Sequence, residues 1–99
     1  MLDEILDKLG QGEILCQLAE EAAELGKAAL KYRRALGCTE NVTPVTAKEA
    51  YKNLIEEIAD VRLCLAVLGL DAGLPAVEAG AVMNAKAERW HKLLFEKEE

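Results

Sequence analysis

Two stretches of eight residues in this chain carry acidic side chains in the same order. Residues 18–25 read Leu-Ala-Glu-Glu-Ala-Ala-Glu-Leu, and residues 54–61 read Leu-Ile-Glu-Glu-Ile-Ala-Asp-Val. Every position is identical or conservatively matched, and the similarity ends outside these two octets, so they are not units of a solenoid repeat. Carboxylates that gather without other ligand types favour a hard divalent cation, Mg²⁺ or Mn²⁺. The octets therefore predict a metal site.

Helical spacing brings the carboxylates of each octet together. At about 100° per residue, Glu21 and Glu57 each lie about 80° from the centre of the apolar stripe of their own helix. Glu24 and Asp60, three residues further on, share the same faces. If the two helices pack antiparallel through their stripes, the four carboxylates converge along one edge. Two such charges at 4 Å repel by about 4 kcal/mol near a protein surface, so we expect raised pKa values or a bound cation.

An ordinary solvated helix face is the alternative interpretation of the first octet. One side of that helix carries Glu13, Glu20, Glu24, Lys27 and Lys31. A single Glu-Glu-x-x-Glu is weak evidence for a site, but two copies in equivalent register favour a metal centre. A di-iron carboxylate bundle would need Glu-x-x-His on two helices, and the only histidine, His91, is far from both octets.

The octets lie in the two long helices that hydrophobic periodicity predicts. Residues 2–9 form a short lead-in helix, which Gly10 and Gly12 interrupt. The first long helix runs from Glu13 to about Leu36, and Gly37 ends it. Its predicted apolar stripe consists of Leu15, Leu18, Ala22, Leu25, Ala29, Tyr32 and Leu36.

A loop over residues 38–45 separates the two octet helices. Thr46 and Glu49 have capping-box spacing, which predicts that the second long helix begins there. Its apolar stripe consists of Leu54, Ile58, Val61, Leu65 and Leu68. Gly69 and Gly73 end it, and Pro75 suits the first turn of a third helix. We predict an all-α fold of three main helices and a short N-terminal helix, which completes a four-helix-type bundle by homo-oligomerisation.

Composition narrows the class of protein. The 99 residues are sufficient for a single domain, 1–99, and the net charge of −6 argues against a nucleic-acid partner. The sequence has no apolar run that would span a membrane and no signal-peptide pattern at its start. Three cysteines lack metal-ligand spacing, and we expect Cys16 and Cys64 to be reduced core thiols of a cytoplasmic protein.

The acidic motifs Glu20-Glu21-x-x-Glu24 and Glu57-x-x-Asp60 resemble the signature of the MazG-like all-α nucleoside triphosphate pyrophosphohydrolases. The later Asn-x-Lys-x-x-Arg element is similar as well; it comprises Asn84, Lys86 and Arg89. The resemblance implies Mg²⁺-dependent hydrolysis of an NTP or dNTP to the monophosphate and pyrophosphate, as in cleaning of the nucleotide pool, with Mn²⁺ as a substitute ion. It also implies a homodimer or a dimer of dimers.

The resemblance assigns roles to individual residues. The metal ligands would be Glu21, Glu24, Glu57 and Asp60, and Glu20 would orient the attacking water or hold a further ion. The phosphates would meet Asn84, Lys86 and Arg89, although a solvated helix flank explains the two cations equally well. For Trp90 and Tyr32, which could stack on a base, core packing is the favoured expectation.

Two other functions remain open from the sequence. The first is phosphoribosyl-ATP pyrophosphohydrolysis on the same fold. The second is a non-catalytic helical module for dimerisation or divalent-ion binding. The spacing between the two acidic motifs is longer than is usual in the MazG signature, and the 38–45 loop accounts for it, which leaves the identity of the substrate open.

Overall fold

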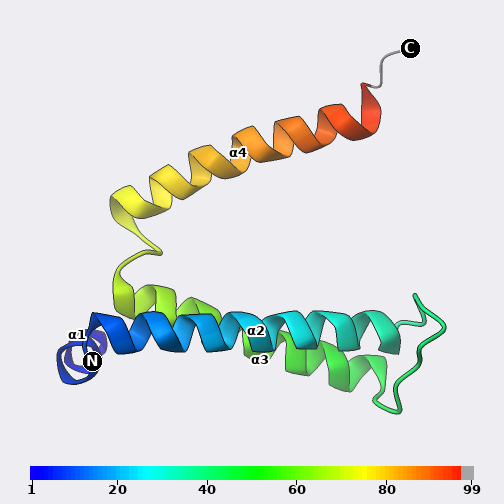
Figure 1. Ribbon diagram of the computed structural model, residues 1–99, viewed down its shortest axis with the longest axis horizontal. Coiled ribbons are helices and arrows are strands. Elements are labelled where there is room, and N and C mark those ends of the chain that lie inside the picture. Colours follow the sequence, from blue (N-terminus) through cyan, green and yellow to red (C-terminus); the bar gives the residue numbers. More distant parts are fainter. Residues whose placement is uncertain (97–99) are drawn as a thin grey trace. The chain divides into compact units, whose positions relative to one another are not determined.

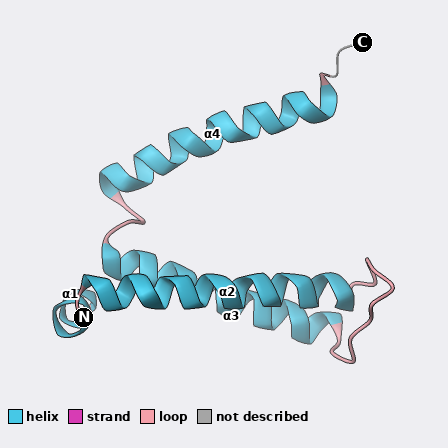
Figure 2. Ribbon diagram, in the orientation of Figure 1, coloured by secondary structure: helices cyan, strands magenta, loops and turns pink. Residues whose placement is uncertain are grey.

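The computed structural model describes residues 1–96, and every regular element within them is an α-helix (Figures 1 and 2). Helix α1 spans Leu2–Leu9, α2 Gln11–Ala35, α3 Ala47–Leu68 and α4 Gly73–Phe95. The all-α prediction of one short and three long helices is confirmed. The chain divides into two compact units: Met1–Leu68, which contains the first three helices, and a second that begins at Gly69 and contains α4. None of these four described helices has the length and apolar content that a membrane crossing requires.

Glycines in the left-handed region set the helix boundaries. Gly10 alone separates α1 from α2 and has φ 87°, and Gly37 follows the last turn of α2 with φ 79°. A positive φ is a conformation that glycine adopts without steric cost. The expectation that Gly12 also lies in the break between the two helices is wrong, because α2 begins at Gln11 and includes Gly12.

The predicted capping box starts α3. The Glu49 backbone N–H donates to Thr46 Oγ1 at 3.1 Å, and the Thr46 backbone N–H donates to Glu49 Oε1 at 3.1 Å. Two amide groups that the first turn of a helix cannot pair are thereby satisfied. This local device explains why the loop after α2 ends where the sequence predicted.

Helices α2 and α3 lie side by side and antiparallel, and α1 packs against both (Figure 1). An apolar cluster in this first unit is centred on the buried Ile14, Cys64 and Val67. Partly buried side chains surround them: Leu2, Ile5, Leu6, Leu18 and Leu68. The three helices therefore share one small apolar core at the α1 end of the α2–α3 pair.

The predicted apolar stripe of α2 divides into two lines of residues spaced by seven. Residues with this spacing lie almost directly above one another on a helix. Leu18, Leu25 and Tyr32 are half-buried, as predicted. The other line is exposed, contrary to the prediction: it comprises Leu15, Ala22, Ala29 and Leu36. Within the unit α2 has one long neighbour, α3, which covers a narrower face than the predicted stripe.

Other expectations about side-chain burial have mixed outcomes. Cys64 is buried as expected, but Cys16 is exposed, so it is not a core thiol; all three cysteines are free. Tyr32 is half-buried and its ring centroid lies 5.7 Å from that of Tyr51. Trp90 on α4 is 68% exposed, so no core within the described part of its own unit covers it. In α4, Pro75 lies in the first turn as predicted.

Candidate metal centre

Two of the predicted ligands occupy central positions of the α2–α3 contact. Glu21 belongs to the line of residues spaced by seven that contains the buried Ile14 and Ala28. Glu57 belongs to the corresponding line of α3, between the buried Ala50 and Cys64. Both carboxylates are half-buried. They therefore lie nearer to the middle of the helix contact than the sequence predicted, at positions that an apolar residue normally occupies.

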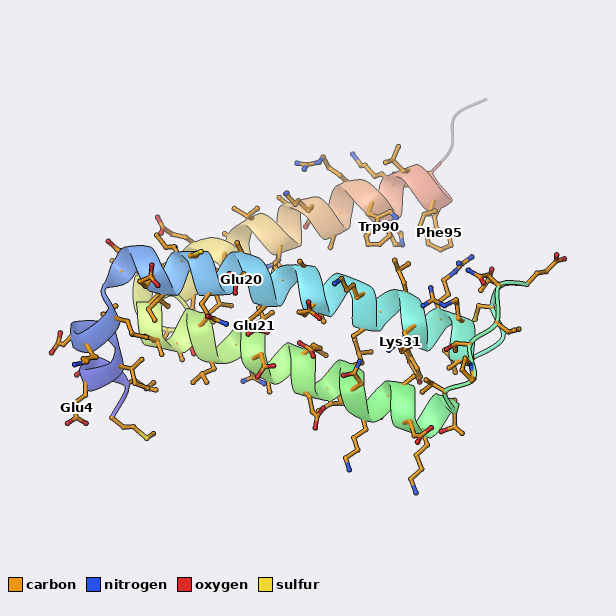
Figure 3. All side chains as sticks on the ribbon, turned by 60° about the horizontal axis from the view of Figure 1, so that its bottom comes forward. Glu4, Glu20, Glu21, Lys31, Trp90 and Phe95 are labelled. Atoms are coloured by element: carbon orange, nitrogen blue, oxygen red, sulfur yellow. The ribbon has the colours of Figure 1, made fainter. Side chains whose placement is uncertain are left out.

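Three carboxylates meet at this contact. Each of Glu21, Glu57 and Asp60 offers one carboxylate oxygen, and these oxygens lie within 4.8 Å of one another. Glu21 lies between α2 and α3 in Figure 3, and the other two side chains come from adjacent turns of α3. Hard oxygen donors from two helices are a ligand set suited to Mg²⁺ or Mn²⁺.

Glu57 has the least favourable surroundings of the three carboxylates in this cluster. Its Oε1 atom is buried and has no hydrogen-bond partner within the described chain. Burial raises the pKa of Glu57 most, and the charges of Asp60, Glu21, Glu24 and Glu56 raise it further. A buried carboxylate oxygen without a donor is unfavourable, because it has lost water and gained no other partner. A cation would provide the missing partner.

Gln17 contacts Glu21 from one turn earlier on α2. Its Nε2 atom donates a hydrogen bond to Glu21 Oε2 at 2.7 Å. An ionised carboxylate accepts several contacts through its two oxygens, so this bond leaves capacity for an ion. Sequence reasoning did not identify Gln17, although its position four residues before Glu21 was a sufficient signal.

The fourth predicted ligand, Glu24, is not among the three that meet. It is exposed, and Lys27 Nζ lies 3.4 Å from its Oε2 atom. Its charge nevertheless contributes to the raised pKa of Glu57. Glu20, the predicted water-orienting residue, is also exposed, and its Oε2 atom accepts a contact from Cys16 Sγ at 4.0 Å.

The predicted phosphate-binding residues belong to the second unit. Asn84, Lys86 and Arg89 are all exposed on α4. The three carboxylates that meet all belong to the first unit, so the geometry of the candidate metal centre involves α2 and α3 alone. His91, to which no role was given, is exposed on the same helix, and its ring centroid lies 4.8 Å from that of Phe95.

An apolar pocket of about 210 Å³ lies one turn from the acidic cluster. It is lined by Ile5, Leu9, Ile14, Gln17, Leu63, Cys64 and Val67. Gln17 connects it to Glu21 by the hydrogen bond described above, and Cys64 follows Asp60 by one helical turn. Burial raises the pKa of the Cys64 thiol, and the charges of Glu21 and Asp60 raise it further. The pocket was not predicted, because it needs α1 to close it.

Comparisons with protein-family models, with curated protein sequences and with solved structures find no match to this chain.

Proposed function

We propose that the chain is a Mg²⁺-dependent nucleoside triphosphate pyrophosphohydrolase, which cleaves an NTP or dNTP to the monophosphate and pyrophosphate. The observation that carries this proposal is the meeting of Glu21, Glu57 and Asp60, with one oxygen of Glu57 buried and unpartnered. The motifs that resemble the MazG-like signature contain these three residues. Participation in cleaning of the nucleotide pool is part of the same proposal.

The three carboxylates repel one another, and a divalent cation between them would be attracted to all three. Without an ion, like charges crowd a half-buried site, and the cost appears in the raised pKa of Glu57. In the proposal Glu21, Glu57 and Asp60 hold the ion, and Glu24 joins them if it leaves Lys27. A bound Mg²⁺ supplies positive charge to phosphate oxygens and makes water more acidic.

The chain's own residues then position the reactants. Glu20 is exposed next to the ligand Glu21, and we assign it the orientation of the attacking water at the α-phosphorus. The cations Lys86 and Arg89, with Asn84, remain the proposed partners of the phosphates. The apolar pocket beside the cluster supports a substrate that has a weakly polar group as well as phosphates.

Self-association is part of the proposal. The line of Leu15, Ala22, Ala29 and Leu36 is exposed along the whole of α2. Apolar residues with heptad spacing are typical of a helix that packs against a second helix on that side. We assign this face to a second copy of the chain, in a homodimer or a dimer of dimers.

Pyrophosphate release from a panel of NTPs and dNTPs, with Mg²⁺ and with EDTA, tests the proposed function. We expect metal-dependent release for at least one triphosphate. Glu21→Gln and Asp60→Asn should reduce that release at least about 100-fold, because each removes a charged ligand of the ion. Glu13→Gln, an exposed glutamate of the same helix outside the octet, is the matched control and should retain activity.

The other outcomes separate the alternatives. If the chain cleaves phosphoribosyl-ATP but none of the NTPs and dNTPs, it is a phosphoribosyl-ATP pyrophosphohydrolase. If Mg²⁺ raises the melting temperature while no substrate is cleaved, the chain is an ion-binding helical module. Release of orthophosphate instead of pyrophosphate would mean that a different bond is broken.

A further inference from the structure

We propose that Gln17 is a positioning residue that holds the Glu21 carboxylate for a divalent cation and joins the metal centre to the apolar pocket. Two independent features meet at this side chain. Its amide donates to Glu21 Oε2 at 2.7 Å, and it lines the pocket. The catalytic consequence rests on the proposed function, whereas the effect on metal binding does not.

The hydrogen bond restricts the rotation of the Glu21 side chain. Within the described residues, no cation forms an ion pair with Glu21. Gln17 is the one side chain there that donates a hydrogen bond to it. A metal-binding carboxylate that is held by a second side chain loses less freedom when it coordinates an ion. Removal of such a supporting partner typically weakens metal binding about 10- to 100-fold.

The position of Gln17 also couples the two halves of the site. Five of the seven side chains that line the pocket are aliphatic, and only Gln17 and Cys64 have polar atoms. Among these seven side chains, the amide of Gln17 is therefore the strongest hydrogen-bonding group. A molecule that contacts this amide changes the bond to Glu21, so occupancy of the pocket and metal affinity influence each other reciprocally.

Titration of Mn²⁺ into the full chain, measured by calorimetry, tests the metal-binding half. Gln17→Leu removes the donor, keeps a side chain of similar size and leaves the pocket apolar. Gln11→Leu, at the only other glutamine of the chain and on the same helix, is the matched control. We expect about 10-fold weaker Mn²⁺ binding for the Gln17 variant and wild-type affinity for the control.

Two further readouts distinguish positioning from a general effect on the helix. The melting temperatures of both variants without metal should stay close to that of the wild type, since an exposed i, i+4 contact contributes little to stability. In pyrophosphate release, the Gln17 variant should need about 10-fold more Mg²⁺ for half-maximal rate and recover most of its rate at saturating Mg²⁺.

Unchanged Mn²⁺ affinity of the Gln17 variant would overturn the proposal, as would an equal loss in the Gln11 variant. If the wild type binds Mn²⁺ but cleaves no triphosphate, the proposed function fails, and the Mn²⁺ affinities still decide the role of Gln17. Absence of Mn²⁺ binding by the wild type would overturn both.

Discussion

At the scale of single residues, the Glu57 carboxyl contributes less to the stability of the fold than an apolar side chain would at the same position. It lies between the buried Ala50 and Cys64, and its Oε1 atom has no hydrogen-bond partner within the described chain. Burial raises its pKa most, the charge of Asp60 raises it further, and three other acidic residues of the same two helices add to the shift. A half-buried position of this kind normally contributes to stability by apolar packing. The Glu57 carboxyl, which suits a cation, thus occupies a position at which an apolar side chain would make the fold more stable. Such a loss of stability is common at functional sites.

The pH dependence of stability should reveal this cost. The pKa of Glu57 is raised in the folded chain from an ordinary value of 4.5. Between pH 4.5 and the raised pKa, Glu57 holds a proton in the folded chain that it has lost in the unfolded chain. The contribution of Glu57 to stability is therefore fully present below pH 4.5 and is lost as the pH rises through the raised pKa.

Glu57→Gln removes this charge and should melt at a higher temperature than the wild type at pH 7 in EDTA. The advantage should shrink as the pH approaches 4, where the wild-type carboxyl is protonated in both states. Thermal unfolding followed by circular dichroism measures both. Glu13→Gln, on an exposed position, should show no comparable dependence on pH, and an equal response of the two variants would contradict the explanation.

At the scale of elements, the start of α3 depends on the reciprocal hydrogen bonds of Thr46 and Glu49. Thr46→Ala should lower the free energy of unfolding by about 1 kcal/mol, because the Glu49 amide loses its acceptor. Denaturation by urea measures this change. Thr43→Ala, in the same loop but outside the capping box, should have a smaller effect, and a larger loss there would show that the loop and not the cap fixes the helix start.

The boundaries of the helices could be predicted from the sequence because their causes are local. Gly10, Gly37 and the Thr46–Glu49 pair each act through their own backbone or through a neighbour three residues away. The burial of each helix face could not be predicted in the same way. Leu15 and Leu18 both fit a pattern of apolar residues three and four apart, and only the position of α3 exposes the first and covers the second.

The candidate site was predictable in part for the same reason. The octets identified Glu21, Glu57 and Asp60 from their spacing. A periodicity argument treats a glutamate as polar and places it beside the apolar stripe, so the central position of Glu21 between Ile14 and Ala28 was missed. Glu24 has the same spacing but is not among the three that meet; it is exposed and pairs with Lys27 at 3.4 Å, which the octet pattern alone did not indicate. The apolar pocket depends on how α1 packs, which no motif encodes.

At the scale of the whole molecule, the exposed line on α2 predicts association between copies. Ala22→Glu places a charge in the middle of that line and should shift the chain towards the monomer by at least about 10-fold in dissociation constant. Analytical ultracentrifugation measures the shift. Ala23→Glu, the next residue, adds the same charge outside the line and should leave association unchanged. A monomeric wild type, or equal dissociation of both variants, would assign the line to another role.

The matched octets on antiparallel helices also give the acidic site an approximate internal two-fold symmetry. Each residue of the first octet corresponds to the one 36 positions later, so Glu21 corresponds to Glu57 and Glu24 to Asp60. Just beyond the octets the correspondence fails, because Lys27 has Leu63 as its counterpart. Lys27 pairs with Glu24, whereas Leu63 lines the pocket and Asp60 belongs to the cluster. The same difference therefore distinguishes the two sides of the site, because the Glu24–Lys27 ion pair lies on one side and the apolar pocket lined by Leu63 lies on the other.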